Sequence, residues 1–190
     1  MSDPAPRTRR HDPGRRDRII EATLDLIADQ GVDGVTHRRV AERADVPLGS
    51  MTYHFDGMEE LLGLAFSRYS DSVAETYGLH LGPATTPEEA RHGVVDFIFS
   101  PFWAERRNIT LLMELYSVVS RSEAMRLRVK AWLNEGRILL ERHFDTPTAR
   151  ALDGMIEGLT IHRSIDPGLL TREQVRTLVD RLAPDVSREH

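Results

Sequence analysis

Apolar residues recur every three to four positions along most of the chain, which is the period of an amphipathic α-helix. No stretch alternates apolar and polar residues strictly, as a half-buried strand would. An apolar stripe from Ile20 to Ile27 ends before Gly31, which suits a helix C-terminus. The sequence therefore predicts an all-α protein. The predicted helices cover about residues 15–30, 36–44, 48–54, 58–80, 87–103, 105–120, 122–144, 147–165 and 171–183.

Residues 36–55 have the pattern of two short helices joined by a tight turn. Thr36 supplies a hydroxyl that can cap the first helix. Asp45 is one of the few residue types besides glycine that tolerate the left-handed conformation such a turn requires, and Val46 can fill the corner. Pro47 suits the first turn of the second helix because its φ is already helical. This pattern is typical of a helix-turn-helix unit, whose second helix fits the major groove of DNA.

The segment from Thr36 to Leu62, THRRVAERADVPLGSMTYHFDGMEELL, resembles the DNA-binding domain of the TetR family of bacterial transcriptional repressors. The resemblance implies a flexible basic arm at 1–14 and a three-helix DNA-binding domain at 15–57. It also implies a C-terminal helical domain at 58–190 for effector binding and dimerisation. Two positions depart from the family pattern: Thr52 stands where the family usually has Tyr, and Met58 where a Lys commonly opens the long fourth helix.

The resemblance also implies which residues contact DNA. The candidates are Thr36 and Arg38 on the first short helix and Gly49, Ser50, Thr52, Tyr53 and His54 on the second. Gly49 and Ser50 are expected nearest the bases, and Tyr53 and His54 along the sugar–phosphate backbone. Arg38 is a candidate guanine contact because its planar guanidinium can pair with two acceptors at once.

Charge is unevenly distributed along the chain. The whole chain has 25 Lys plus Arg against 30 Asp plus Glu, a net charge of −5, which excludes a histone-like coating of DNA by bulk charge. Residues 1–18 instead hold six Arg against three Asp. We therefore expect the arm to reach phosphates or a minor groove through Arg7, Arg9, Arg10, Arg15 and Arg16. Taken alone, an arginine-rich N-terminus is more often a solvated tail.

A homodimer is a further implication of the resemblance, because one recognition helix spans too few base pairs for useful specificity. Its interface would be a four-helix bundle made by helices 147–165 and 171–183 of each protomer. Gly154 and Gly158 share one helix face and would allow close approach, although they could simply loosen the helix. The interface candidates are Leu152, Met155, Gly158, Leu159, Val175, Leu178, Val179 and Leu182.

The family's effector pocket lies among the fourth to eighth helices, a region rich in aromatic residues here. The candidate pocket residues are Phe66, Tyr69, Phe97, Trp103, Glu114, Tyr116, Trp132, Met155 and His162. Most such residues are expected to be ordinary core. Glu114 lies in the apolar run TLLMELYSVV, so its carboxylate needs either a nearby arginine or a polar ligand group as its partner.

Other chemistry is not indicated. The chain has no cysteine, and it has no HExxH, glycine-rich phosphate loop or GxSxG motif. Its eight histidines show no paired metal-ligand spacing, so we expect no enzyme, no cofactor and no metal. No apolar run approaches the roughly 18 residues of a membrane span, and the N-terminus has no signal-peptide core, which predicts a cytoplasmic protein without a membrane partner.

The resemblance implies a transcriptional regulator that a small-molecule effector releases from double-stranded DNA. Effector binding would favour a dimer whose recognition helices no longer match a palindromic operator. The alternative is a helical adaptor that binds other proteins and has lost specific DNA binding, for which salt-dependent DNA binding would be absent.

Overall fold

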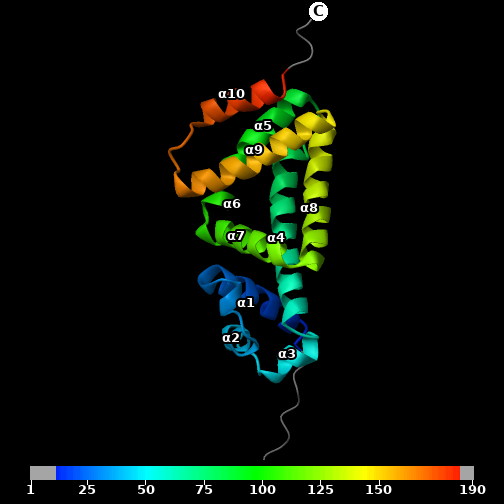
Figure 1. The fold of residues 1–190 in the computed structure, drawn as a ribbon, viewed down its shortest axis with the longest axis vertical. Helices are drawn as coiled ribbons and strands as arrows, with labels where there is room; N and C mark the ends of the chain where they lie inside the picture. The colour runs from blue at the N-terminus through cyan, green and yellow to red at the C-terminus, as the bar shows by residue number, and fades with distance from the viewer. Residues whose placement is uncertain (1–11, 185–190) are drawn as a thin grey trace, which may run out of the picture.

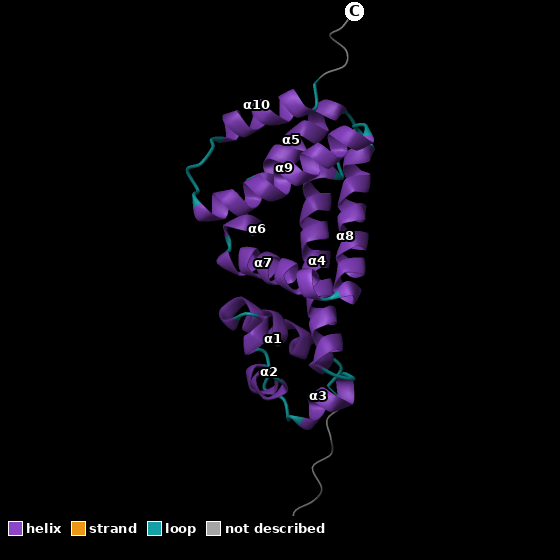
Figure 2. Ribbon diagram, in the orientation of Figure 1, coloured by secondary structure: helices purple, strands orange, loops and turns teal. Residues whose placement is uncertain are grey.

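The computed structural model describes residues 12–184, and every regular element in this range is a helix (Figure 2). The order is α1 (Arg15–Gln30), the 3-10 turn η1 (Val32–Gly34), α2 (His37–Arg43), α3 (Gly49–His54), α4 (Met58–Leu81), α5 (Pro87–Ile98), α6 (Pro101–Ala104), α7 (Arg106–Arg121), α8 (Glu123–Glu141), α9 (Thr146–Ile165) and α10 (Arg172–Leu182). The predicted all-α fold is confirmed. No helix between residues 12 and 184 is both long and apolar enough to cross a membrane.

One predicted helix is wrong. Residues 87–103 form two helices, because α5 ends at Ile98 and α6 begins at Pro101. Proline has no N–H to donate and disfavours the helical conformation of the residue before it. Ser100 accordingly has an extended ψ of 141°, and its hydroxyl accepts a hydrogen bond from the Phe102 N–H at the start of α6.

The helices form two groups joined by α4 (Figure 1). Helices α1, α2 and α3 cluster at one end, and the long α4 runs from this cluster into a larger group, where it lies beside α8. Helix α7 packs against α1 and so connects the two groups a second time.

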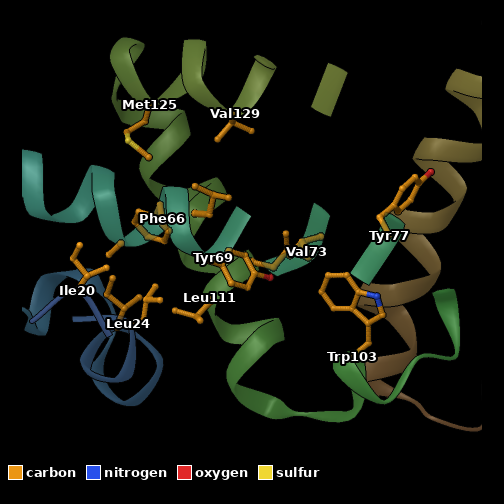
Figure 3. Packing of buried hydrophobic residues seen from close by; sticks show 14 of the residues in the cluster. Ile20, Leu24, Phe66, Tyr69, Val73, Tyr77, Trp103, Leu111, Met125 and Val129 are labelled. Carbon is orange, nitrogen blue, oxygen red and sulfur yellow. The ribbon is translucent and has the colours of Figure 1, made fainter. Parts of the chain in front are cut away.

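A single apolar core extends through both groups. Figure 3 shows side chains of α1, α4, α7 and α8 meeting, among them Leu24, Phe66, Leu111 and Val129. Apolar burial is the main favourable term in folding, so the two groups stabilise each other through this shared core.

Candidate functional site

The turn between α2 and α3 has the geometry that the sequence predicts. The Thr36 hydroxyl accepts a hydrogen bond from the Arg39 N–H, 3.3 Å away, and so caps α2. Asp45 has a φ of 52° and is the one non-glycine residue with a positive φ in the range 12–184. The Val46 N–H then donates to the Ala41 carbonyl at 3.0 Å, which closes the corner.

Helix α3 presents a short polar face to solvent. Tyr53 is 83% exposed, and Gly49 and Thr52 are also exposed, whereas His54 is half-buried. Ser50 is only 7% exposed, beside the fully buried Met51. The structure therefore does not support the expectation that Ser50 lies nearest the bases. Its motif position placed it there, whereas the helical turn directs its side chain inward.

Arginines on α2 and its surroundings pair with exposed acids. The Arg38 Nε lies 3.1 Å from Oε1 of Glu42, and the Arg43 guanidinium lies 2.7 Å from the Asp29 carboxylate. Exposed pairs of this kind contribute little to stability, so the arginines can exchange a carboxylate for a phosphate or a base at small cost.

The predicted basic arm falls largely outside the described residues, including Arg7, Arg9 and Arg10. Two of its arginines lie in the first turn of α1. The Arg16 guanidinium is 5.4 Å from the centre of the Phe55 ring, at the C-terminus of α3. Arg15 lies near Asp12, which also pairs with Arg18 at 2.6 Å.

A cavity of about 330 Å³ lies in the larger group of helices. Side chains of α4 to α9 line it, and they include the predicted Phe97, Trp103, Tyr116 and Trp132. The ring centroids of Phe97 and Trp103 are 5.6 Å apart in an edge-on arrangement. This volume is within the range of pockets that hold drug-sized molecules, on the order of 300–1,000 Å³.

Five predicted pocket residues, among them Glu114, do not line this cavity. Phe66 and Tyr69 are buried in the core, and the Tyr69 hydroxyl donates to the Asn108 carbonyl at 2.7 Å. Met155 and His162 lie on other faces of α9, and His162 is exposed. An apolar pattern identifies the buried side of a helix but not the turn that meets a cavity.

Glu114 has a different role from the one expected of it. Its carboxylate accepts a hydrogen bond from the Val32 N–H at 2.9 Å, in the turn that follows α1. A Cβ built on Gly31 would lie 3.2 Å from Oε1 of Glu114, so the carboxylate is packed against this turn. Its partner is thus a backbone N–H, not an arginine or a ligand, and the contact joins α7 to the group formed by α1, α2 and α3.

The cavity also contains polar residues that the prediction missed. Asp153, Glu157 and Thr160 of α9 line it, as does Glu135 of α8, and none of the described lining residues is Lys, Arg or His. Burial raises the pKa of Asp153, as does the neighbouring Glu157, while Arg137 opposes the shift. Their spacing of three and four residues along α9 was the signal in the sequence that could have identified them.

Several polar atoms of the cavity lining are buried without a partner. The Tyr77 hydroxyl, the Trp103 Nε1 and the Thr160 Oγ1 have no hydrogen-bond partner within the described part of the chain. Burial is also the main cause that raises the pKa of Tyr77 and of Tyr116, and for Tyr116 the nearby Glu157 carboxyl adds to it. Buried polar groups normally have partners, so these three side chains of the cavity lining retain hydrogen-bonding capacity.

The predicted dimer residues divide into two sets. Leu152, Val175 and Val179 are fully buried within the protomer, so their assignment to a dimer interface is wrong. Both faces of α9 and α10 carry apolar residues, and these three belong to the inner face. Leu182 is exposed, and the remaining four candidates, Met155, Gly158, Leu159 and Leu178, are half-buried and remain predictions.

Comparison with known proteins agrees with this geometry. Residues 19–65 match the family model described as bacterial regulatory proteins, tetR family. The protein SCO1917 of Streptomyces coelicolor A3, a member of the TetR family, is 30% identical with a TM-score of 0.77, over 91% of this chain and 100% of its own. This chain belongs to the TetR family. It is accordingly a transcriptional regulator and not an enzyme.

Two further solved structures resemble most of the chain. SCO7518 of Streptomyces coelicolor A3(2), solved as a candidate transcriptional regulator, is 44% identical with a TM-score of 0.85, over 91% of this chain and all of its own. The multidrug binding protein EbrR, solved with imidazole, is 30% identical with a TM-score of 0.77, over 97% of this chain and 98% of its own. EbrR has also been solved with proflavin, ethidium and malachite green.

Proposed function

We propose that this TetR-family chain is a repressor that binds a palindromic DNA operator as a homodimer and is released by a small molecule. The observation that carries the proposal is the continuity of α4, which begins at Met58, four residues after the recognition helix α3 ends, and contributes Val73, Ala74 and Tyr77 to the cavity. A molecule that displaces these side chains tilts the helix on which α3 is mounted. Such a regulator acts in the cytoplasm, where its operator lies.

The DNA contacts follow from what α2 and α3 expose. Tyr53 projects an aromatic ring into solvent, and Gly49 and Thr52 leave the adjacent face shallow enough for a base edge to approach. Arg38 lies on the same unit, in an exposed ion pair, and is the candidate for guanine. These residues, with Thr36 and His54, make up the proposed DNA surface.

Phosphate anchoring depends on arginines more than is usual in the family. Met58 opens α4 without a positive charge, and Oε2 of Glu60 accepts a hydrogen bond from the Asp56 N–H at 2.6 Å. The N-terminus of α4 is therefore already neutralised by its own acid and attracts a phosphate weakly. Arg16, beside the end of α3, is the best-placed described cation for this role.

The proposed dimer uses the outer faces of α9 and α10. Nothing lies within 4 Å of a Cβ built on Gly154 or Gly158, so both glycines open onto free surface. Small residues four apart allow a partner helix to approach closely. In this arrangement residues 15–57 form the DNA-binding domain and residues 58–190 the effector-binding and dimerisation domain.

Selection of bound sequences from a random duplex pool tests the proposal. The wild type, Arg38→Ala and Arg126→Ala are compared at two salt concentrations. Arg126 is an exposed arginine of α8, in the larger group of helices and outside the proposed dimer faces of α9 and α10 (Figure 1), and it serves as the matched control. We expect an enriched inverted repeat, with Arg38→Ala relaxing one position of each half-site by about 1–3 kcal/mol.

The control variant should recover the wild-type motif. Enrichment of a single half-site would contradict the homodimer. Recovery of no motif by the wild type would contradict DNA recognition, and the protein-binding adaptor would then be the better hypothesis.

A further inference from the structure

The residues that line the cavity indicate which chemical class of effector would fit it. It is mainly apolar and aromatic, with Tyr77, Trp103, Tyr116 and Trp132 contributed by four different helices. In Figure 3, Tyr77 and Trp103 lie apart from the core around Phe66, and both rings make edge contacts with Phe97. Flat aromatic surfaces on several sides suit a ligand that is itself a flat ring system.

The charges of the cavity all have one sign. Asp153 and Glu157 lie one helical turn apart on α9, and both are half-buried. Two like charges at this spacing destabilise a helix, and burial adds the cost of removing each from water. A cation placed between them offsets both penalties through its attraction to the two carboxylates.

The nearby arginine does not already fill this role. Arg137 of α8 interacts with Asp153, but its Nε lies 3.5 Å from Oε1 of Glu141, and it also binds the Asn134 side chain. One cation is therefore shared between Glu141 and Asp153. Glu157 interacts instead with the Tyr116 hydroxyl, which is neutral. The acids of the cavity outnumber the cations that face them.

Two of the three unpartnered polar atoms, the hydroxyls of Thr160 and Tyr77, fit the same ligand. Thr160 is 2% exposed and Tyr77 is 6% exposed, and both hydroxyls can accept a hydrogen bond from an amino or ammonium group. Aromatic faces also attract cations, more strongly where water is excluded.

We propose that the cavity selects aromatic monocations, with the positive charge beside Asp153 and Glu157 and the ring among the aromatic side chains. This inference rests on the proposed effector role of the cavity and specifies the chemical class of the effector. A neutral ring of the same shape would gain the aromatic contacts but leave the two carboxylates repelling each other.

Three tricyclic probes of matched shape test this inference without DNA. They are 9-aminoacridine, a cation at neutral pH, acridine, which is neutral, and anthracene-9-carboxylate, an anion. Equilibrium dialysis of the full-length protein gives the affinities. Tryptophan fluorescence reports the location, because both tryptophans of the chain, Trp103 and Trp132, line the cavity.

The acids are tested by Asp153→Asn combined with Glu157→Gln. Glu75→Gln, which removes an exposed acid from the outer side of α4, is the matched control. We expect the double variant to bind the cation about tenfold or more weakly, a loss of at least about 1.4 kcal/mol, while acridine affinity changes less than about twofold. Loss of the repulsion should raise the melting temperature of the double variant without ligand, so misfolding does not complicate the result.

Each other outcome overturns the inference. Equal binding of all three probes would show that charge does not select the ligand. An unchanged affinity of the double variant for the cation would show that Asp153 and Glu157 do not bind it. Failure of every probe to bind would contradict aromatic selection, whereas an operator recovered in the duplex selection would still support the DNA-binding proposal.

Discussion

Charged residues are arranged in opposite ways around α1 and α2 and in the cavity lined by α4 to α9. Around α1 and α2, the ion pairs join an arginine to an acid, as in Arg38 with Glu42 and Arg43 with Asp29. In the cavity, Asp153 and Glu157 lie beside each other. The first arrangement is stable alone and readily exchanges a carboxylate for a phosphate, whereas the second stores repulsion that a bound cation relieves.

The two ends are joined by contacts between α7 and α1. Arg107 lies 2.5 Å from the Glu21 carboxylate and 3.0 Å from that of Asp25, and Glu114 accepts the Val32 N–H. On another face of α7, Leu112 and Tyr116 line the cavity. Movement of α7 on ligand binding would therefore be transmitted to α1, at the start of the DNA-binding domain. This route would act in addition to the one through α4.

The largest expected effect is on self-association, through Gly158→Leu. The protomer has room for a Cβ at this position, since nothing lies within 4 Å of it. In a two-fold interface two leucines would clash with the partner, and we expect the dimer dissociation constant to rise about a hundredfold or more, about 3 kcal/mol. Sedimentation equilibrium measures this change.

Gly78→Leu is the matched control, because Gly78 lies on α4 and its Cβ position is equally open. This variant should remain dimeric. A dimer of Gly158→Leu as strong as the wild type would contradict the assignment of this face of α9 to the dimer interface.

A smaller effect, on stability, is expected at the contact between α7 and the turn that follows α1. Glu114→Ala leaves the Val32 N–H without its acceptor, which should cost about 1–3 kcal/mol in the free energy of unfolding. Glu114→Gln retains an acceptor oxygen and should lose less. Denaturant titration measures both, and operator affinity with and without ligand shows whether the link also transmits the signal. Equal stability of Glu114→Ala and wild type would contradict a structural role for this hydrogen bond.

The sequence predicts the DNA-binding end better than the cavity, for a physical reason. The Thr36 cap and the left-handed Asp45 are set by neighbours within a few residues, and the structure has both. Which turn of α9 faces the cavity depends on packing against other helices, so Asp153 was missed and Met155 was wrongly included. Glu114 was recognised as needing a partner, but its partner is 82 residues away in the sequence.

The smallest expected effect tests whether the turn at Asp45 is held only by its neighbours in the sequence. Asp45 has a φ of 52°, which a β-branched residue adopts only with strain, so Asp45→Val should destabilise the turn by about 1–2 kcal/mol. Asp45→Gly fits this conformation and should be close to the wild type. Because the turn is held by its own neighbours, Asp45→Val should weaken operator binding while leaving tryptophan fluorescence and probe affinity in the cavity unchanged. A loss of probe affinity equal to the loss of operator affinity would show that the turn and the cavity are not independent.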